Sequence, residues 1–477
     1  MQVGPLLGLR SEVRRPDDRE RRTLYTLTTA SGIGLAAALL LWVAIANGFP
    51  LCHSDTGTYV DSSFTWRVPP DRPVFYGLFL AVTHARETLW APVIVQAAIA
   101  AIGIHLLLRL LTPTYGVTAT VLVVTLLAAT TSLPWFVGQL SPDFFAGVLV
   151  VSFYLVIASA DHLGRAARRF AVACLVLSVV VHSSHILLAT ILAGVVQLQA
   201  QWMRPPPWRH AGVRRVWRAL AAAVVVMLVG NLLLSGKLTL AGGAHAFLMG
   251  RLIEDGVMQR VLDEQCPTTP YRLCAFRSQL PMSADDYLWP ADGLLKQTGS
   301  WRGSRAESWQ LILRAVATHP LLITAGALRA SARQLGRFRT GEGLGPLAAG
   351  SWVDTVIARR FPHEYDRFVE SRQQQGTLPI DTAATVGQRI AIVAGLLAVM
   401  LAIGHVPTAP WSPFAGLVVT ALLGNAVVTG TLSEVHDRYQ SRLIWLVVLA
   451  ALLGVLRRFE RHVTRDHDEL PVLSDSV

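Results

Sequence analysis

Ten apolar runs, separated by short polar stretches, dominate the chain. Several approach the roughly 20 residues that a helix needs to cross the hydrocarbon core of a bilayer. After the seventh run, a much more polar segment, residues 237–387, interrupts the series. The pattern therefore predicts an all-α polytopic membrane protein with about ten transmembrane helices and an extracytoplasmic loop module. The candidate spans are residues 24–46, 89–111, 117–133, 144–160, 170–181, 186–198, 219–234, 390–403, 414–431 and 443–456.

The spans at 170–181 and 186–198 flank the polar sequence His182-Ser-Ser-His185. One kinked helix fits this pattern, and so do two helices that meet at a polar tip. We favour two helices, because an even number of spans then places both termini on the same side of the membrane.

The same pattern divides the chain into five regions. In the outer module, apolar residues recur at helical spacing over 319–335 with Arg329 and Arg333 among them, which predicts a helix lying on the membrane surface. The regions are a basic cytoplasmic segment (1–23), a core of seven spans (24–236) with a first outer loop (47–88), the outer module (237–387), the last three spans (388–456) and a cytoplasmic tail (457–477).

Composition supports a membrane protein and excludes other classes. Hydrophobic residues make up 52% of the chain and charged residues 15%, against about 25% charged residues in an ordinary soluble domain. These proportions exclude a soluble enzyme, a coiled coil and a disordered protein. The absence of a Gly-rich turn between a predicted strand and a helix also argues against a nucleotide site.

The distribution of arginine predicts the orientation. The net charge of +11 alone would suit a nucleic-acid partner, but the segments assigned to the cytoplasm hold 19 arginines and the short opposite loops only five. The positive-inside rule accounts for such an asymmetry. We therefore expect a multi-pass protein of a bacterial cytoplasmic (inner) membrane, with both termini in the cytoplasm and with lipid rather than nucleic acid as its partner.

Cys266 and Cys274 enclose a short loop that contains two prolines in the outer module. The predicted topology places this loop on the oxidising side of the membrane, which favours a disulfide. A zinc site is less favoured, because no second Cys or His pair stands nearby at the spacing of metal ligands. We therefore predict a structural disulfide between these two residues.

Ionisable residues gather at the outer ends of the predicted spans. A charge inside hydrocarbon costs about 2.5–3.5 kcal/mol on insertion scales, so charges at this depth need a partner or a function. The predicted topology places four such clusters on one side, where they would line a common cavity. The clusters are residues 55–72 in the first outer loop, Asp143 at the fourth span, His182 with His185, and residues 434–442 before the last span.

The first outer loop carries candidate acids, a tyrosine and a basic residue. Asp55 is a candidate general base for an acceptor hydroxyl, and Tyr59 is a further cavity candidate. Asp61 would share that site or bind a divalent cation together with Asp55, while capping of a helix is the alternative for either carboxylate. The Arg72 guanidinium suits a phosphate, with a lipid headgroup or an internal ion pair as the alternative.

Asp143 and the two histidines each have a structural explanation beside a functional one. Asp143 follows Ser141-Pro142 in the first turn of its helix, where a carboxylate is stabilised by free backbone N–H groups. Its depth at the membrane edge leaves a catalytic role open. His182 and His185 would share one helical face, where they would donate to a phosphate, bind a metal or hydrogen-bond to a neighbouring helix.

The stretch before the last span contains two arginines four residues apart, Arg438 and Arg442. A helix presents residues at this spacing on one face. Both lie on the side where the positive-inside rule leaves few arginines, so phosphate binding is our interpretation and anchoring to anionic headgroups the alternative. Glu434 and Tyr439 complete the cavity candidates.

Several of these motifs resemble those of the GT-C superfamily of glycosyltransferases, which includes protein mannosyltransferases and the aminoarabinose transferases of lipid A. The likeness covers about the first 200 residues and the stretch after residue 387, but not the outer module. The sequence departs from the superfamily's common Asp-Glu pair, and histidines stand where lysine is frequent. The matching motifs are Asp55 and Tyr59 followed by Arg72-Pro-Val-Phe-Tyr, then Pro142-Asp143, and Glu434-x-x-x-Arg438-Tyr439.

The resemblance implies transfer of a hexosyl or pentosyl group from a polyprenyl-phosphate donor to a lipid, glycan or protein acceptor on the extracytoplasmic face. Asp55 would be the catalytic carboxylate and Asp143 a second acid, with His182 or His185 and Arg438 at the donor phosphate. Two other classes compete. One is a transporter or flippase of a lipid-linked or anionic substrate, although we find no two related halves, and the other is a non-catalytic membrane assembly partner.

Overall fold

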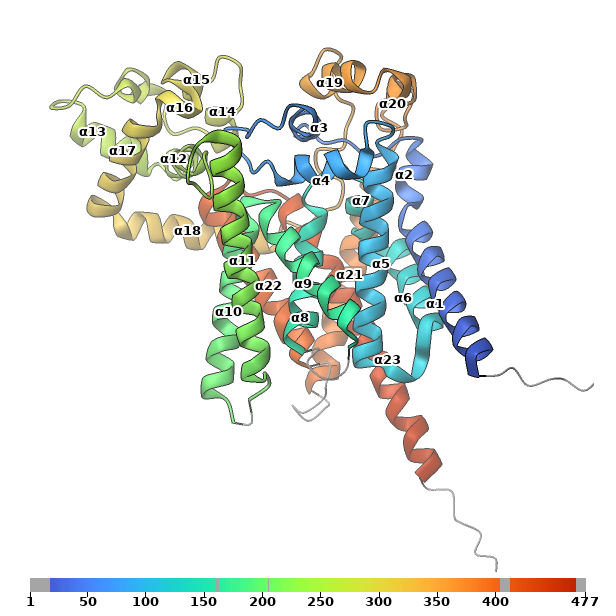
Figure 1. Ribbon diagram of the computed structural model, residues 1–477. Coiled ribbons are helices and arrows are strands. Elements are labelled where there is room, and N and C mark those ends of the chain that lie inside the picture. The colour runs from blue at the N-terminus through green and yellow to red at the C-terminus, as the bar shows by residue number, and fades with distance from the viewer. Residues whose placement is uncertain (1–17, 159–162, 205, 404–411, 469–477) are drawn as a thin grey trace, which may run out of the picture.

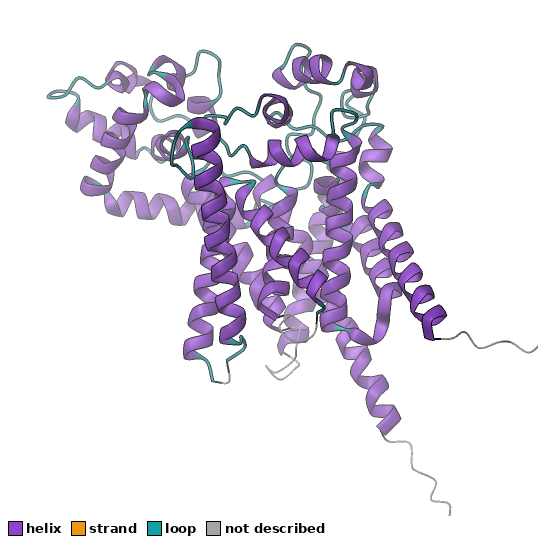
Figure 2. Ribbon diagram, viewed as in Figure 1, coloured by secondary structure: helices purple, strands orange, loops and turns teal. Residues whose placement is uncertain are grey.

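A bundle of long helices carries a cap of short helices at one end (Figure 1). The computed structural model describes residues 18–158, 163–204, 206–403 and 412–468. Within these ranges every regular element is a helix, apart from a single backbone bridge between Leu51 and Gln139. Figure 2 shows that loops concentrate in the cap. The predicted basic segment (1–23) lies mostly outside the described residues, as do residues 469–477 of the predicted tail.

Each predicted span overlaps a helix of the bundle, although the first, 24–46, covers both α1 and the short helix α2 (Trp42–Asn47). Within the described ranges, seven of these helices are long and apolar enough to cross a membrane, and counting the bent pair α17–α18 as one span makes eight. The chain is therefore a multi-pass membrane protein. The bundle helices are α1 (Asp18–Leu40), α5 (Trp90–Leu111), α6 (Gly116–Thr130), α8 (Phe144–Ala158), α9 (Arg165–Val180), α10 (Ser183–Trp202), α11 (His210–Ser235), α21 (Ile380–Ile403), α22 (Ser412–Leu432) and α23 (Arg438–Asp468).

Helix α8 forms the centre of the bundle. Its residues from Phe144 to Val156 are all buried, so a sequence that is apolar on every face suits this position. Glycine allows two neighbours to approach it closely: a Cβ at Gly147 would lie 2.6 Å from the Trp445 ring of α23, and one at Gly212 of α11 would lie 2.2 Å from the Ile157 carbonyl oxygen. This packing brings the start of α23 beside the start of α8.

The chain breaks between α9 and α10, as two separate helices require. The Nδ1 atom of His182 accepts a hydrogen bond from the Ser184 backbone N–H at 3.2 Å and so caps the start of α10. The prediction of two helices that meet at a polar tip is therefore correct for this segment.

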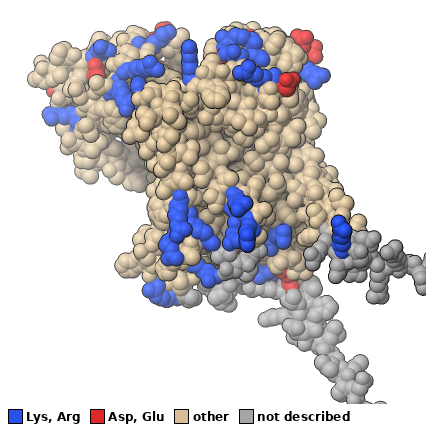
Figure 3. All heavy atoms as spheres, viewed as in Figure 1, with Lys and Arg blue, Asp and Glu red and all other residues tan. Residues whose placement is uncertain are grey.

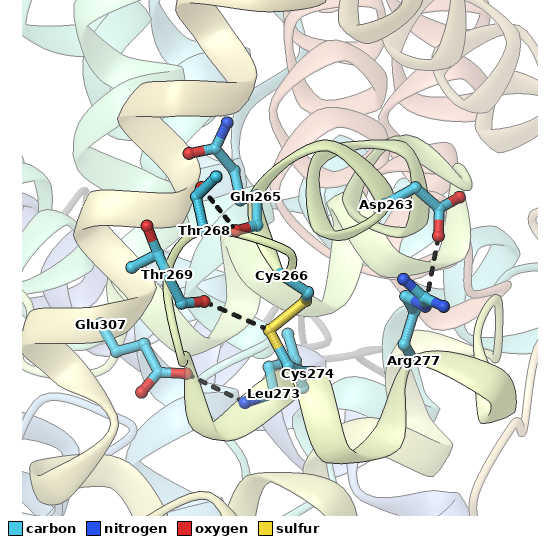
Figure 4. The surroundings of a disulfide bond; sticks show 9 residues. All are labelled: Asp263, Gln265, Cys266, Thr268, Thr269, Leu273, Cys274, Arg277 and Glu307. Carbon is cyan, nitrogen blue, oxygen red and sulfur yellow. Dashed lines mark hydrogen bonds and ion pairs between the residues drawn. A yellow bond between two sulfur atoms is a disulfide. The ribbon is translucent and has the colours of Figure 1, made fainter.

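The first part of the long outer segment folds around a core of its own, and we call residues 244–318 the outer lobe. Buried side chains from six of its helices, such as Met249, Leu262, Tyr287 and Leu311, form this core. The predicted disulfide joins Cys266 to Cys274 there (Figure 4). The lobe contains α12 (Ala244–Glu254), α13 (Val257–Gln265), η2 (Arg272–Gln279), α14 (Ala284–Leu288), α15 (Leu294–Gln297), α16 (Ser300–Gly303) and α17 (Arg305–Thr318).

Helix α18 (Pro320–Leu335) leaves α17 at an angle of 99°. In Figure 1 it runs across the direction of α10 and α11, and it crosses α22 so closely that a Cβ at Gly430 would lie 2.8 Å from the Ser331 backbone nitrogen. Leu321 and Leu328 are exposed. The orientation fits a helix parallel to the membrane surface, the arrangement predicted for 319–335.

The remaining outer residues, 338–379, pack on the first outer loop instead of on the outer lobe, and we call them the clamp segment. Buried side chains of α19, including Val353 and Ile357, belong to the same core as Tyr59 and Val60 of α3. Because α21 begins at Ile380, the predicted module boundary at 387 falls inside a helix. The short cap helices are α2 (Trp42–Asn47), α3 (Thr56–Thr65), α4 (Phe75–His84), α7 (Leu133–Val137), α19 (Trp352–Arg360), η3 (Pro362–Glu364) and α20 (Tyr365–Val369), while η1 (Pro113–Tyr115) joins α5 to α6.

Candidate functional site

Two long-range contacts fix the first outer loop. The Leu51 N–H donates to the Gly138 carbonyl at 2.8 Å, and the Leu51 carbonyl accepts from the Leu140 N–H at 2.9 Å. On the other side, the Gln373 side chain accepts from the Cys52 N–H at 3.0 Å and donates to the Cys52 carbonyl at 2.5 Å. The start of α3 is therefore held between the segment before α8 and the clamp segment.

Asp55 precedes α3 and faces two guanidinium groups. Its Oδ1 lies 3.0 Å from Arg72 Nη1, and its Oδ2 lies 3.8 Å from Arg438 Nη1. Burial opposes ionisation, but Arg72 and Arg438 hold the pKa of Asp55 well below its usual range. The side chain makes no capping hydrogen bond to α3 and remains 28% exposed. The carboxylate is thus ionised and accessible at neutral pH.

The Arg72 guanidinium has further partners in the same loop. Its Nε donates to Asp71 at 2.7 Å, and its Cζ lies 5.2 Å from the centre of the Tyr59 ring. An internal ion pair, one of the alternatives considered from the sequence, is therefore present at this arginine. These contacts orient the guanidinium towards Asp55.

Arg438, the first residue of α23, connects the first outer loop to the clamp segment. Its Nη1 donates to His53 Nε2 at 2.8 Å, and its backbone N–H donates to Glu342 at 2.7 Å. Burial and Arg438 lower the pKa of His53 to about 4, so this imidazole is a neutral acceptor. The Nε of Arg438 is buried and has no hydrogen-bond partner within the described residues.

The second arginine of α23 forms a different pair. Arg442 Nη1 donates to Asp143 at 2.6 Å, and its Nη2 donates to Asn425 at 2.9 Å and to Ser184 at 3.3 Å. The Arg442 side chain is 0% exposed and that of Asp143 is 8% exposed. The Tyr439 ring contacts both arginines, with its centre 5.4 Å from the Arg442 Cζ and 5.1 Å from that of Arg438. One aromatic ring therefore connects the two acid–base pairs.

The two predicted histidines differ in their surroundings. His182 stacks on His185 with ring centres 4.9 Å apart, and its Nδ1 lies 2.9 Å from Ser184 Oγ, which in turn contacts Arg442. His185 is fully buried, and its Nδ1 donates to the Ser178 carbonyl at 2.7 Å. His182 therefore belongs with the residues around Arg442, whereas His185 ties α10 to α9.

Asp61 has partners other than those of Asp55, contrary to the prediction of a shared site. Arg359 and Arg360 of α19 donate to its Oδ1 at 2.8 and 2.9 Å. Two cations already neutralise this carboxylate, which disfavours a metal ion there. Nor does the described part of the chain bring together three or more acidic, histidine or cysteine side chains that could hold a metal. Asp61 instead joins α3 to the clamp segment.

The residues before α23 connect the site to the outer lobe. Glu434 accepts a hydrogen bond from the Asp285 backbone N–H of α14 at 2.8 Å. His436 lies between Asp285 and Glu342, at 3.5 and 3.2 Å. Although burial lowers it, the pKa of His436 rises to about 10 because both carboxylates stabilise the charged ring. This imidazolium holds the outer lobe and the clamp segment at the start of α23.

Two cavities adjoin these residues. The smaller measures about 10 Å³ and lies between Asp143, Glu342 and Arg438, with Trp135 and Gln139 in its wall. Such a volume holds about one water molecule. The larger measures about 370 Å³ and is lined by Glu254, Arg333, Gly336, Arg337, Glu434 and Val435.

The structure brings most of the predicted residues into one cluster. Asp61 and His185 lie outside it, and Glu434 borders it. His53, Glu342 and His436 were missed as site residues. The close approach of Gly343 to His53 indicates that His53 is part of the site, but it is visible only in the structure. The φ of Gly343 is +75°, and a Cβ there would lie 2.4 Å from His53 Nε2. The cluster contains Asp55, Tyr59, Arg72, Asp143, His182, Arg438, Tyr439 and Arg442.

Comparisons with protein-family models, with curated proteins and with solved structures found no match for this chain. Any functional conclusion therefore rests on the chemistry of the cluster.

Proposed function

We propose that the protein is a ten-span glycosyltransferase of the GT-C type, which moves a sugar from a polyprenyl-phosphate donor to an acceptor on the extracytoplasmic face. The observation that carries the proposal is the meeting of Asp55, Arg72 and Arg438 at the cap end of the bundle. A carboxylate and cations at one membrane face suit a reaction that needs a base and a phosphate site.

The donor phosphate would bind to arginine N–H groups that the protein leaves without partners. The Nε atom of Arg438 is buried and lacks a hydrogen-bond partner in the described part of the chain. A buried N–H without a partner costs about 1–3 kcal/mol, so such atoms favour a ligand that accepts hydrogen bonds. Arg72, which faces the same carboxylate as Arg438, would add a second cation.

Asp55 would act as the general base. Its carboxylate takes the proton of an acceptor hydroxyl or amine, whose oxygen or nitrogen attacks the anomeric carbon of the donor sugar. The bond between that carbon and the phosphate oxygen breaks, and the lipid phosphate leaves with the electron pair. Arg72 and Arg438 stabilise the charge that develops on this leaving group.

A transfer assay with purified protein and radiolabelled polyprenyl-phosphate sugars tests the proposal. We expect the wild type to transfer label and Asp55→Asn to lose transfer. Asp61→Asn is the matched control, because Asp61 also lies on the first outer loop beside two arginines but belongs to the contact with α19. Equal transfer by wild type and Asp55→Asn would contradict the assignment of this carboxylate.

The proposal includes the orientation expected from the arginines, with both termini in the cytoplasm of a bacterial inner membrane. In Figure 3 basic side chains gather both around the end of the bundle away from the cap and on the cap, so support for this orientation comes from the arginines of the short loops, to which the positive-inside rule applies. A membrane-impermeant maleimide should label Lys296→Cys of the outer lobe in intact cells and leave His210→Cys at the start of α11 unlabelled. The opposite pattern would reverse the topology. Both native free cysteines are buried and give little background.

A further inference from the structure

We propose that an aromatic platform on the outer lobe, formed by Phe247, Trp289 and Trp301, binds a sugar ring of the acceptor. The inference rests on the proposed function and deepens it, because it makes the acceptor a carbohydrate. Flat aromatic faces suit the C–H-rich faces of sugar rings, while the polar groups around them bind the hydroxyls.

The three rings form one contiguous group. The ring centre of Trp289 lies 6.0 Å from that of Phe247 and 5.9 Å from that of Trp301, and Phe247 and Trp301 are 5.4 Å apart. Trp289 is nevertheless 45% exposed, whereas the other two rings are half-buried. The group therefore presents the Trp289 ring to solvent, with two half-buried rings in contact with it.

A carboxylate lies at the edge of this face. Asp285 Oδ1 accepts a hydrogen bond from Trp289 Nε1 at 2.9 Å, which fixes the orientation of the indole. The Asp285 side chain is 43% exposed. Carboxylate oxygens retain further lone pairs for hydroxyl donors. A ring held in place beside an accessible carboxylate offers both kinds of contact that a saccharide needs.

The platform lies next to the candidate catalytic cluster on two sides. A Cβ at Gly243 would lie 2.9 Å from the Asp71 Cα and 3.1 Å from the Trp301 ring, so this glycine contacts both the platform and the loop that carries Arg72. On the other side, Asp285 pairs with His436, which precedes Arg438 by two residues. An acceptor bound to the platform would therefore extend towards Asp55.

Anchoring in lipid headgroups is the other role of exposed tryptophan at a membrane surface. Such an anchor keeps its indole N–H for water and headgroups. In Trp289 this N–H is bound to Asp285 instead. Trp202, at the end of α10, is 80% exposed and carries no carboxylate or second ring among its described contacts, so it fits the anchoring role better.

Binding of two neutral trisaccharides, mannotriose and arabinotriose, to the full-length protein in nanodiscs tests the platform without any need for turnover. Saturation-transfer NMR should show that at least one binds, and that Trp289→Ala weakens it about 3- to 10-fold. Trp289→Phe should retain affinity within about twofold, because it keeps a flat ring. Trp309→Ala, which removes a partly exposed tryptophan of α17, is the control and should bind like the wild type.

Absence of binding by both trisaccharides, or equal affinity for wild type and Trp289→Ala, would overturn the platform. A Trp289→Ala protein with a raised KM for the lipid donor and unchanged trisaccharide affinity would assign the ring to the donor and also overturn it. Trisaccharide binding that depends on Trp289, in a protein without transfer activity, would support the platform and contradict the proposed function.

Discussion

Two arginines on the first turns of α23 each pair with an aspartate, and the two pairs differ in access. Arg442 and Asp143 are 0% and 8% exposed, at 2.6 Å, and Asn425 and Ser184 bind the same guanidinium. Asp55 is 28% exposed and its contact with Arg438 is 3.8 Å long. The first pair is enclosed and closely bonded, while the second is open and loose.

This difference indicates which pair stabilises the fold and which is available to a substrate. A buried pair is costly to desolvate, so it persists only when its hydrogen bonds are nearly complete, and removal of one partner leaves an uncompensated charge. An open carboxylate between two cations can exchange one contact for a ligand at little cost. We therefore assign the Arg442 pair mainly to packing of α23 against α8, and the Arg438 pair to chemistry.

The largest expected effect comes from breaking the enclosed pair. Arg442→Met should destabilise the protein by about 3–5 kcal/mol, because Asp143 would remain buried without a cation. The midpoint of thermal unfolding in detergent measures the loss. The double variant Arg442→Met/Asp143→Leu should recover most of it, since both charges are gone. A single variant as stable as the wild type would mean that Asp143 is solvated.

Replacement of Asp55 and of Asp143 by asparagine, each in a separate variant, tests the difference between the two pairs. Asp55→Asn should reduce transfer at least about 100-fold, which corresponds to about 2.7 kcal/mol in the transition state, and change stability by less than about 1 kcal/mol. Asp143→Asn should show the reverse, with the larger loss in thermal stability. Parallel unfolding and transfer measurements on the two variants give the answer. Identical profiles would remove the distinction between the pairs.

Replacement of each arginine by lysine has a smaller effect. Arg438→Lys keeps the charge but loses the fork of N–H donors, so we expect the KM for the lipid-phosphate donor to rise about tenfold. The same change at Arg442 should instead lower the unfolding temperature, because three hydrogen bonds to Asp143, Asn425 and Ser184 depend on that fork. A donor KM that Arg438→Lys leaves unchanged would place the phosphate elsewhere.

The smallest expected effect concerns His436, which joins the open pair to the outer lobe. Its pKa is raised to about 10 in the folded protein, against about 6.5 in an unfolded chain. The stabilisation it provides is therefore complete below pH 6.5 and is lost as the pH rises towards 10. We expect a loss of about 1 kcal/mol, because solvent screens both partner carboxylates, Asp285 and Glu342, whose side chains are 43% and 34% exposed. Thermal unfolding of wild type and His436→Gln should converge over this range, and a constant difference would contradict the assignment.

Much of the fold is predictable from the local pattern of apolar residues, because each apolar run of membrane-spanning length predicts one helix independently of the rest of the chain. The break at His182 and the disulfide at Cys266 and Cys274 also depend on neighbouring residues only. The division of 237–387 into two parts was missed, because it depends on what each part packs against. The outer lobe forms its own core, whereas buried side chains of α19 pack in the same core as those of α3.

The sequence predicts which residues belong to the site better than it predicts which of these residues contact one another. Topology alone places Asp55, Asp143 and Arg438 at one end of the bundle, since parity decides which loops share a side. Topology does not predict that Asp61 contacts α19 or that Glu342 contacts Arg438. The first contact joins residues 298 positions apart and the second joins residues 96 positions apart. Their partners follow from the path of the clamp segment, which has no sequence motif.

The two hydrogen bonds between the Gln373 side chain and the Cys52 backbone join residues 321 positions apart. A nascent chain therefore inserts its first helices long before the residue that fixes the Asp55 loop has left the ribosome, and Arg438 follows later still. Until then the carboxylate has neither its scaffold nor its second cation. If the proposed function holds, incomplete translation products are inactive, because the complete cluster forms only as synthesis ends.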